Sequence, residues 1–143
     1  MGKGDGASQK MCRDKIMELE DRILAYKQFL TKDKVYSLYK NGSENFVVNN
    51  LDELECFLSE NLAYDMIKWG YAHLVMPRLK KFGLSFNIFF VDKLIEFKKW
   101  DVIVDYIEYA DAEPHQLAEF VVRIIEAWYS DNPYRFQWWN RFR

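Results

Sequence analysis

Apolar residues recur at helical spacing along most of the chain. Near the N-terminus they form one seam, separated by steps of 4, 3, 4, 3 and 4 residues, which consists of Cys12, Ile16, Leu19, Ile23, Tyr26 and Leu30. This spacing predicts an amphipathic helix over residues 12–30. Two uses of the seam are open, namely packing on the protein's own core or pairing with a second copy. The preceding residues 1–9 hold three of the six glycines and are predicted to be a flexible tail.

The pattern over residues 35–48 is less regular. Residues 35–39 fit either a short helix or a short strand that ends at the turn signal Asn41-Gly42. The following apolar run, residues 46–48, is short and contains two valines, which favour strands. A minor β-hairpin near residues 35–48 is therefore open alongside a helical interpretation.

Two later segments carry the same apolar pattern 28 residues apart, MIKWGYAHLVMPRLKKFG at 66–83 and LIEFKKWDVIVDYIEYAD at 94–111. The aligned pairs are Met66 and Leu94, Ile67 and Ile95, Trp69 and Phe97, Leu74 and Val102, Val75 and Ile103, and Leu79 and Ile107. Such a period is typical of a repeated supersecondary unit, and these units mostly serve in binding. Each copy predicts two helices joined by a tight break, and Pro77 predicts a kink in the first copy. A further helix is predicted from about residue 115 to 129.

The stretch GYAHLVMPRLKKFG, with its terminal glycine, resembles the second helix of an ankyrin repeat, and KKWDVIVDYIEYAD resembles a second copy. The resemblance to ankyrin-type repeats covers about residues 63–111, although both copies lack the Thr-Pro-Leu-His signature. It implies a stack of helical hairpins that binds another protein. The predicted fold is thus mainly α, either a small single-domain helical bundle or a short helical-repeat stack, with one domain over residues 10–143.

Composition supports a folded domain without indicating its chemistry. The chain has 143 residues, half of them apolar and 17% aromatic, so it can bury a core. A net charge of −2 gives no general attraction to nucleic acid or anionic membranes, so nucleic acid is not expected as a direct ligand. No apolar run approaches the length of a membrane span, and no apolar signal region opens the chain. These features predict a cytoplasmic protein that does not act on membranes.

No arrangement of nucleophiles, bases or metal ligands stands out. Cys12 and Cys56 match no metal or redox spacing. His73 and His115 each lack a second ligand three or four residues away. We therefore expect no catalytic, metal or cofactor site. The alternative is a small enzyme whose site is assembled only in three dimensions, in a pocket lined by Cys56 or His73.

Acidic residues gather in two places. Residues 44–65 contain six acids, Glu53 and Glu55 among them, and no Lys or Arg. The second group, spaced so that a helix would place it on one face, consists of Asp101, Asp105 and Glu108. The simpler interpretation of both groups is solvated surface. The functional interpretation is a surface that binds a basic protein partner.

The last ten residues, YRFQWWNRFR, interleave five aromatic rings with three arginines. Aromatic residues and Arg dominate the hot spots of protein interfaces, and the same mixture stacks on single-stranded bases. This tail either completes the core or contacts a partner. In the second case the candidate partner-binding residues are Arg135, Trp138, Trp139 and Arg141.

Together these patterns predict a non-enzymatic binding protein that occupies a surface on a macromolecular partner. Small, acidic, aromatic-rich chains without catalytic motifs are typical of inhibitors encoded by phages or mobile elements, including anti-CRISPR proteins. Inhibition of a nucleic-acid-processing or defence complex is therefore one form of the hypothesis. A further alternative is a helical dimerisation or adaptor module in which residues 12–30 pair two copies.

Overall fold

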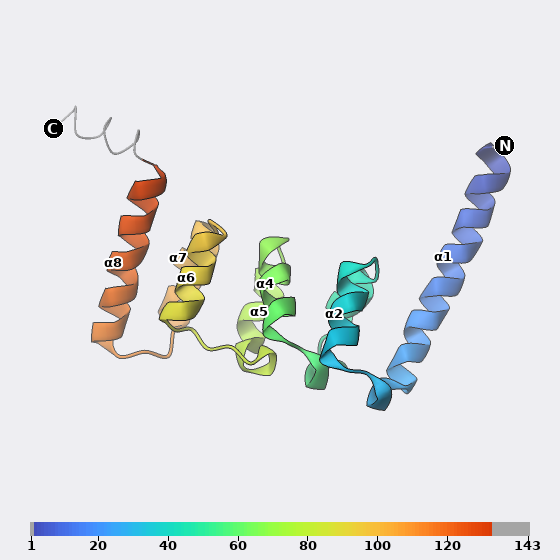
Figure 1. Ribbon diagram of the computed structural model, residues 1–143, viewed down its shortest axis with the longest axis horizontal. Coiled ribbons are helices and arrows are strands. Elements are labelled where there is room, and N and C mark those ends of the chain that lie inside the picture. The colour runs from blue at the N-terminus through green and yellow to red at the C-terminus, as the bar shows by residue number, and fades with distance from the viewer. Residues whose placement is uncertain (1, 133–143) are drawn as a thin grey trace. The chain divides into compact units, whose positions relative to one another are not determined.

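The structure, a computed structural model, describes residues 2–132, with side chains described from residue 9 onward (Figure 1). Within residues 2–132 the chain forms eight α-helices and four short 3-10 helices (η) and no strand, which confirms the mainly α prediction. The elements are α1 (Gly2–Ala25), η1 (Lys27–Phe29), α2 (Lys32–Lys40), α3 (Glu44–Asn49), η2 (Glu55–Phe57), α4 (Glu60–Lys68), α5 (Ala72–Val75), η3 (Met76–Phe82), α6 (Ile88–Glu96), α7 (Trp100–Tyr106), η4 (Ile107–Tyr109) and α8 (Pro114–Asp131).

The β-hairpin left open near residues 35–48 is wrong, because α2 and α3 cover this segment. A strand would place Ser37 on the same face as its buried neighbours Val35 and Tyr39. The helix instead buries Val35 and Tyr39 four positions apart and leaves Ser37 exposed. The turn at Asn41-Gly42 is present, but it joins two helices rather than two strands.

The chain divides into two compact units, with the boundary between Ala63 and Tyr64 inside α4. The units are described separately below as unit 1, before this boundary, and unit 2, after it. The single domain over residues 10–143 stays a prediction, since compactness alone does not show whether either unit folds by itself. Similarly, α1 begins at Gly2, inside the segment 1–9, and the flexibility of that segment stays a prediction.

The 28-residue period is present in the positions of the helices, and a third copy precedes the two found in the sequence. The nine-residue helices α2, α4 and α6 begin at residues 32, 60 and 88, each 28 positions after the last. A polar side chain precedes each helix and accepts a hydrogen bond from the backbone N–H three residues later. These side chains are Thr31, Ser59 and Asn87, at 3.1, 3.3 and 3.0 Å. Each satisfies a backbone donor that the first turn of a helix leaves open.

The turn that follows each of these helices is also repeated. Gly42, Gly70 and Lys98 lie 28 residues apart and have φ angles of +130°, +96° and +57°. The next helices, α3, α5 and α7, begin at residues 44, 72 and 100. Glycine adopts positive φ without steric cost, so Lys98 is the exception in this series. The Lys98 ammonium forms an ion pair with Asp131 at the end of α8, at 2.9 Å.

Unit 1 is built around the contact of α2 with α3. Its buried apolar residues are Val35, Tyr39, Phe46, Val47, Leu51, Leu54, Leu58, Leu62 and Ala63. The C-terminal part of α1 joins this group through a 2.9 Å hydrogen bond that the Ser43 hydroxyl donates to the Glu20 carboxylate. The core of this unit therefore draws on the first repeat copy and the start of the second.

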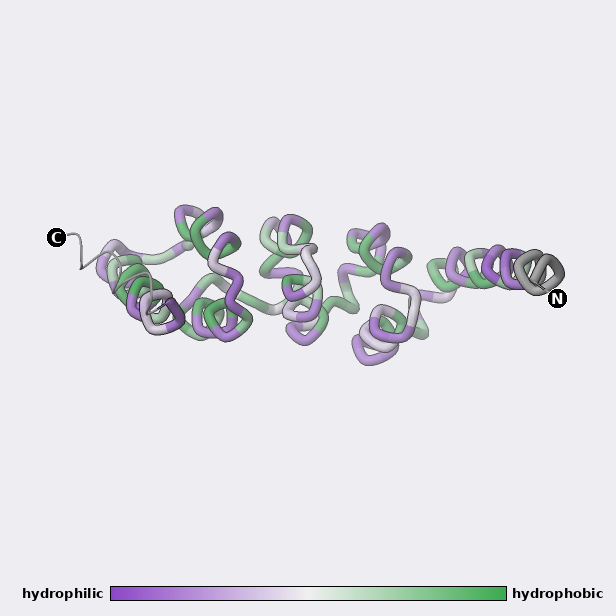
Figure 2. The backbone as a smooth tube through the Cα atoms, turned by 90° about the horizontal axis from the view of Figure 1, so that it is seen from above, coloured by the Kyte–Doolittle hydropathy of each residue, from purple (hydrophilic) through white to green (hydrophobic). Residues whose placement is uncertain are grey.

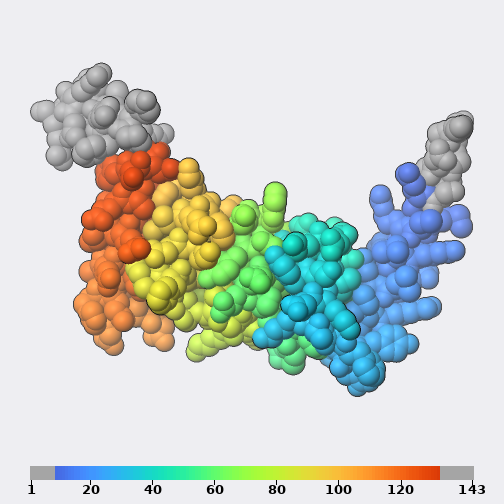
Figure 3. All heavy atoms as spheres, viewed as in Figure 1, coloured from blue at the N-terminus to red at the C-terminus, as the bar shows by residue number. Residues whose placement is uncertain are grey.

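Unit 2 places α6 at its centre, in contact with both α7 and α8. An aromatic cluster anchors α6, with the Phe90 ring 6.1 Å from Tyr64 and 5.3 Å from Phe86 between centroids. Figure 3 shows α8, in orange to red, packed directly beside α6, in yellow. Arg123 of α8 forms an ion pair with Asp92 of α6. The helix predicted for residues 115–129 is thus confirmed as α8.

Candidate binding groove

An apolar groove in unit 2 lies between η3 and the segment where α7 gives way to η4. One part of it, about 350 Å³, is lined by Met76, Pro77, Leu79, Phe86, Tyr106 and Tyr109. A second part of about 290 Å³ shares Leu79, Phe86 and Tyr109 and continues to the start of α8 at Gln116 and Phe120. The shared residues make these two hollows one continuous groove, called the η3–η4 groove below.

Local sequence explains both walls of this groove. Pro77 lacks a backbone donor, so α5 stops after four residues and the chain continues as η3, with Arg78 at the non-helical angles φ −120° and ψ 21°. The kink predicted at Pro77 is therefore confirmed. On the opposite wall, α7 changes to a 3-10 helix after Tyr106. That change places the rings of Tyr106 and Tyr109 6.3 Å apart between centroids.

The groove leaves a large apolar surface in contact with water. Tyr109 is 77% exposed although its ring lines the groove, and Val104 on the neighbouring turn of α7 is 66% exposed. Single exposed apolar residues are ordinary, but several around one hollow indicate a contact surface. Tyr is also among the residues that most often carry binding energy in interfaces.

Exposed acids accompany the groove along the chain. Asp101 and Asp105 lie on α7, and Glu108 lies in η4 between the groove residues Tyr106 and Tyr109. The change of helix type interrupts the single α-helical face expected for these three acids, since a 3-10 helix has a different number of residues per turn. Asp111 and Lys80 line the second part of the groove. Carboxylates therefore predominate over cations beside the apolar lining of η4.

The other predicted site residues lie elsewhere. Glu53 and Glu55 belong to unit 1, where Glu53 forms an ion pair of 3.5 Å with Lys27. The four candidate residues of the tail, Arg135, Trp138, Trp139 and Arg141, lie outside the described residues.

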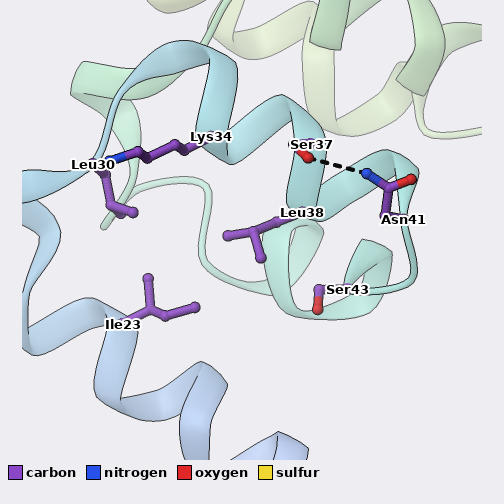
Figure 4. A pocket seen from close by; sticks show the side chains of 7 residues that line it. All are labelled: Ile23, Leu30, Lys34, Ser37, Leu38, Asn41 and Ser43. Carbon is purple, nitrogen blue, oxygen red and sulfur yellow. Dashed lines mark hydrogen bonds between the residues drawn. The ribbon is translucent and has the colours of Figure 1, made fainter.

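Unit 1 contains a groove of its own, about 370 Å³, between the end of α1 and α2. Figure 4 shows Ile23 and Leu30 facing Leu38 across it, with polar side chains around the edge. The edge groups already have partners, since Asn41 donates to Ser37 at 3.0 Å and Lys34 donates to the carbonyl of Phe29 at 3.4 Å. This groove thus offers a partner fewer polar groups than its lining suggests.

Among the described residues, no three His, Cys, Asp or Glu side chains are placed to hold a metal ion. Cys12, Cys56, His73 and His115 are all exposed. The apolar part of the η3–η4 groove is lined by Met, Pro, Leu, Phe and Tyr, which offer contact area and a phenol hydroxyl. Between residues 2 and 132, none of the helices has the length and apolar character needed to cross a membrane.

Comparisons with protein-family models, curated proteins and solved structures returned no match for this chain. The function proposed below therefore depends on the geometry of the η3–η4 groove. Sequence reasoning identified Pro77 and the neighbouring acids but not the groove itself. The available signal was the pair Tyr106 and Tyr109, which follow the last acid-rich turn at a spacing suited to one face of a 3-10 helix.

Proposed function

We propose that this chain is a non-enzymatic binding protein whose η3–η4 groove receives an apolar side chain of a protein partner. The observation that carries this proposal is an apolar groove with a largely exposed tyrosine, Tyr109, at its edge. Covering such a surface releases about 25 cal/mol per Å² of apolar area, which favours a partner that fills it. The exposed acids Asp101, Asp105 and Glu108 favour partners with Lys or Arg around the apolar side chain.

We also propose that the three copies form a short helical-repeat stack of the ankyrin type rather than a bundle. The support is the constant 28-residue spacing of the N-cap side chains, the positive-φ turns and the helix starts. Within unit 2, Tyr64 of α4 contacts Phe90 and Phe97 of α6, which are two successive first helices. Contact between neighbouring copies is what holds repeat stacks together, and their exposed surfaces serve binding.

Inhibition of a nucleic-acid-processing or defence complex stays a prediction, and it is compatible with a protein-binding groove. The contribution of the tail residues Arg135, Trp138, Trp139 and Arg141 to partner binding stays a prediction as well.

The groove is tested with short synthetic peptides that carry a central Leu, Met or Phe flanked by Lys and Arg, by Glu, or by Ser and Gln. Fluorescence anisotropy should show saturable binding of the basic peptides, and Tyr109→Ala should weaken it about tenfold because the ring's contact area is lost. The matched control is Phe89→Ala, which removes a ring that is 75% exposed in the same unit but does not line the groove. The proposal is wrong if no peptide binds saturably, or if the two substitutions weaken binding equally.

Charge reversal tests the role of the acids. Asp105→Lys combined with Glu108→Lys should slow association of the basic peptides and flatten the dependence of the rate on salt, because long-range attraction is lost. Asp101 is left unchanged, since an acid in the first turn of α7 stabilises that helix. Reversal of Glu53 and Glu55 provides the comparison in unit 1. Stopped-flow rates that keep the same salt dependence after the α7–η4 reversal would show that these acids are only solvated surface.

A further inference from the structure

The N-terminal helix α1 exposes most of its apolar seam. Ile16 and Leu19 are 50% and 53% exposed, and Cys12 is also exposed. Figure 2 shows hydrophobic and hydrophilic residues alternating along α1, as expected for a helix with one apolar side. Such a seam on a surface helix normally packs against another element, because its exposure to water is unfavourable.

Only the C-terminal end of the seam meets another part of unit 1. Ile23 and Leu30 face Leu38 of α2 across the unit 1 groove, and Glu20 accepts the hydrogen bond from Ser43 (Figure 4). Helix α1 has 24 residues and α2 has nine, so α1 extends well past the element it meets. The part of the seam from Cys12 to Leu19 therefore remains available for a further helix.

We propose that this part of α1 pairs in parallel with α1 of a second copy of the chain. The seam follows a heptad in which Ile16 and Ile23 take the a positions and Leu19 takes a d position. Ile at a with Leu at d is the combination that favours parallel two-stranded coiled coils. This inference concerns a surface of unit 1 and does not depend on the η3–η4 groove.

The charges beside the seam favour the same orientation. In a parallel pair, Lys15 at a g position lies opposite Glu20 of the other copy at an e position, so the contact forms twice between opposite charges. The Glu20 carboxylate uses one oxygen for Ser43, which leaves its second oxygen for the lysine. An antiparallel pair would instead bring Lys15 against Arg22, which repel each other.

Cys12 gives a direct test of the orientation, because it occupies the d position before Ile16. In a parallel pair the two Cys12 thiols lie side by side, within the short range that a disulfide requires. Adding diamide to the full chain carrying Cys56→Ser should then join two chains, as both thiols lose a proton and an electron to the diamide. In an antiparallel pair the two Cys12 residues would lie at opposite ends of the contact and would not join.

The decisive variants are Ile16→Asp and Met17→Asp in this Cys56→Ser background. Both side chains are about half exposed on α1, at 50% and 55%, but only Ile16 belongs to the seam. We expect Ile16→Asp to lower the yield of disulfide-linked dimer at least tenfold and Met17→Asp to leave it unchanged. Sedimentation velocity under reducing conditions should show a concentration-dependent dimer that Ile16→Asp removes, and circular dichroism verifies that both variants keep their helix content.

Three results would overturn the proposal. One is a chain that sediments as a monomer at every concentration and forms no diamide-dependent dimer. Another is a dimer whose disulfide yield is equal for the two variants, since the seam would then not be the contact. The third is a reversible dimer that depends on Ile16 but never links through Cys12, which would show that the two helices are antiparallel.

Discussion

Replacing Phe90 by alanine is expected to lower the free energy of unfolding by about 3–5 kcal/mol. The Phe90 side chain is 1% exposed and lies between the rings of Tyr64 and Phe86, at centroid distances of 6.1 and 5.3 Å. Its removal leaves a cavity where α4, α6 and the loop before α6 meet. Domains of this size are stabilised by about 5–15 kcal/mol in total, so the loss is a large share.

The neighbouring ring provides the matched control for this prediction. Phe89 is 75% exposed, so Phe89→Ala should change stability by no more than about 0.5 kcal/mol. Urea unfolding followed by circular dichroism measures both variants under the same conditions. A large loss at Phe89 with a small loss at Phe90 would contradict the placement of α6, because it would mean that the helix turns its other side to the core.

Much of the helical architecture could be predicted from local pattern. Apolar spacing located α8 and the period of 28 residues, and Pro77 located the break between α5 and η3. Each of these signals depends on interactions within a few residues, which the sequence displays directly. Residues 35–48 were ambiguous because two valines and an Asn-Gly turn favour strands locally, while burial of Val35 and Tyr39 against α3 favours helix.

The third repeat copy was missed because its side chains differ from those of the other two. The residues at the third position of the three long helices are Lys34, Leu62 and Phe90, and only the last two are apolar. What the copies share is backbone geometry, with a polar cap before the helix and a positive φ after it. Apolar alignment is insensitive to both features, although Gly42 and Gly70 stand at the same spacing in the sequence.

The η3–η4 groove could be predicted only in part. The acids on α7 were visible in the sequence, but the lining combines η3, the loop at Phe86 and the end of α7. Contact between segments about 30 residues apart is set by how the helices pack, which no short-range pattern encodes. The exposure of Tyr109 likewise follows from the change to η4 after Tyr106 rather than from residue type.

The repeated turn gives the second prediction, in which the same residue type has opposite effects at different positions. Gly42→Ala and Gly70→Ala should each lower stability by about 1–2 kcal/mol, because alanine is strained at φ angles of +130° and +96°. No atom lies within 4 Å of a Cβ built at either glycine, so the backbone strain is the whole cost. Gly42 should be the more costly of the two, since its φ lies further from the left-handed helical region that alanine can reach.

Lys98 should respond in the opposite direction, because its φ of +57° already strains a residue that carries a Cβ. Its ion pair with Asp131 offsets part of that strain, so Lys98→Gly is best measured in an Asp131→Asn background, where the pair is absent. There we expect a gain of about 1 kcal/mol in urea unfolding, and a smaller gain in the native background. The matched control is Lys99→Gly, which should destabilise because Lys99 has a φ of −90° and glycine there only adds freedom to the unfolded chain. If Lys98→Gly lowered stability in the Asp131→Asn background as well, Lys98 would not be the counterpart of Gly42 and Gly70, and the third copy of the turn would lose its support.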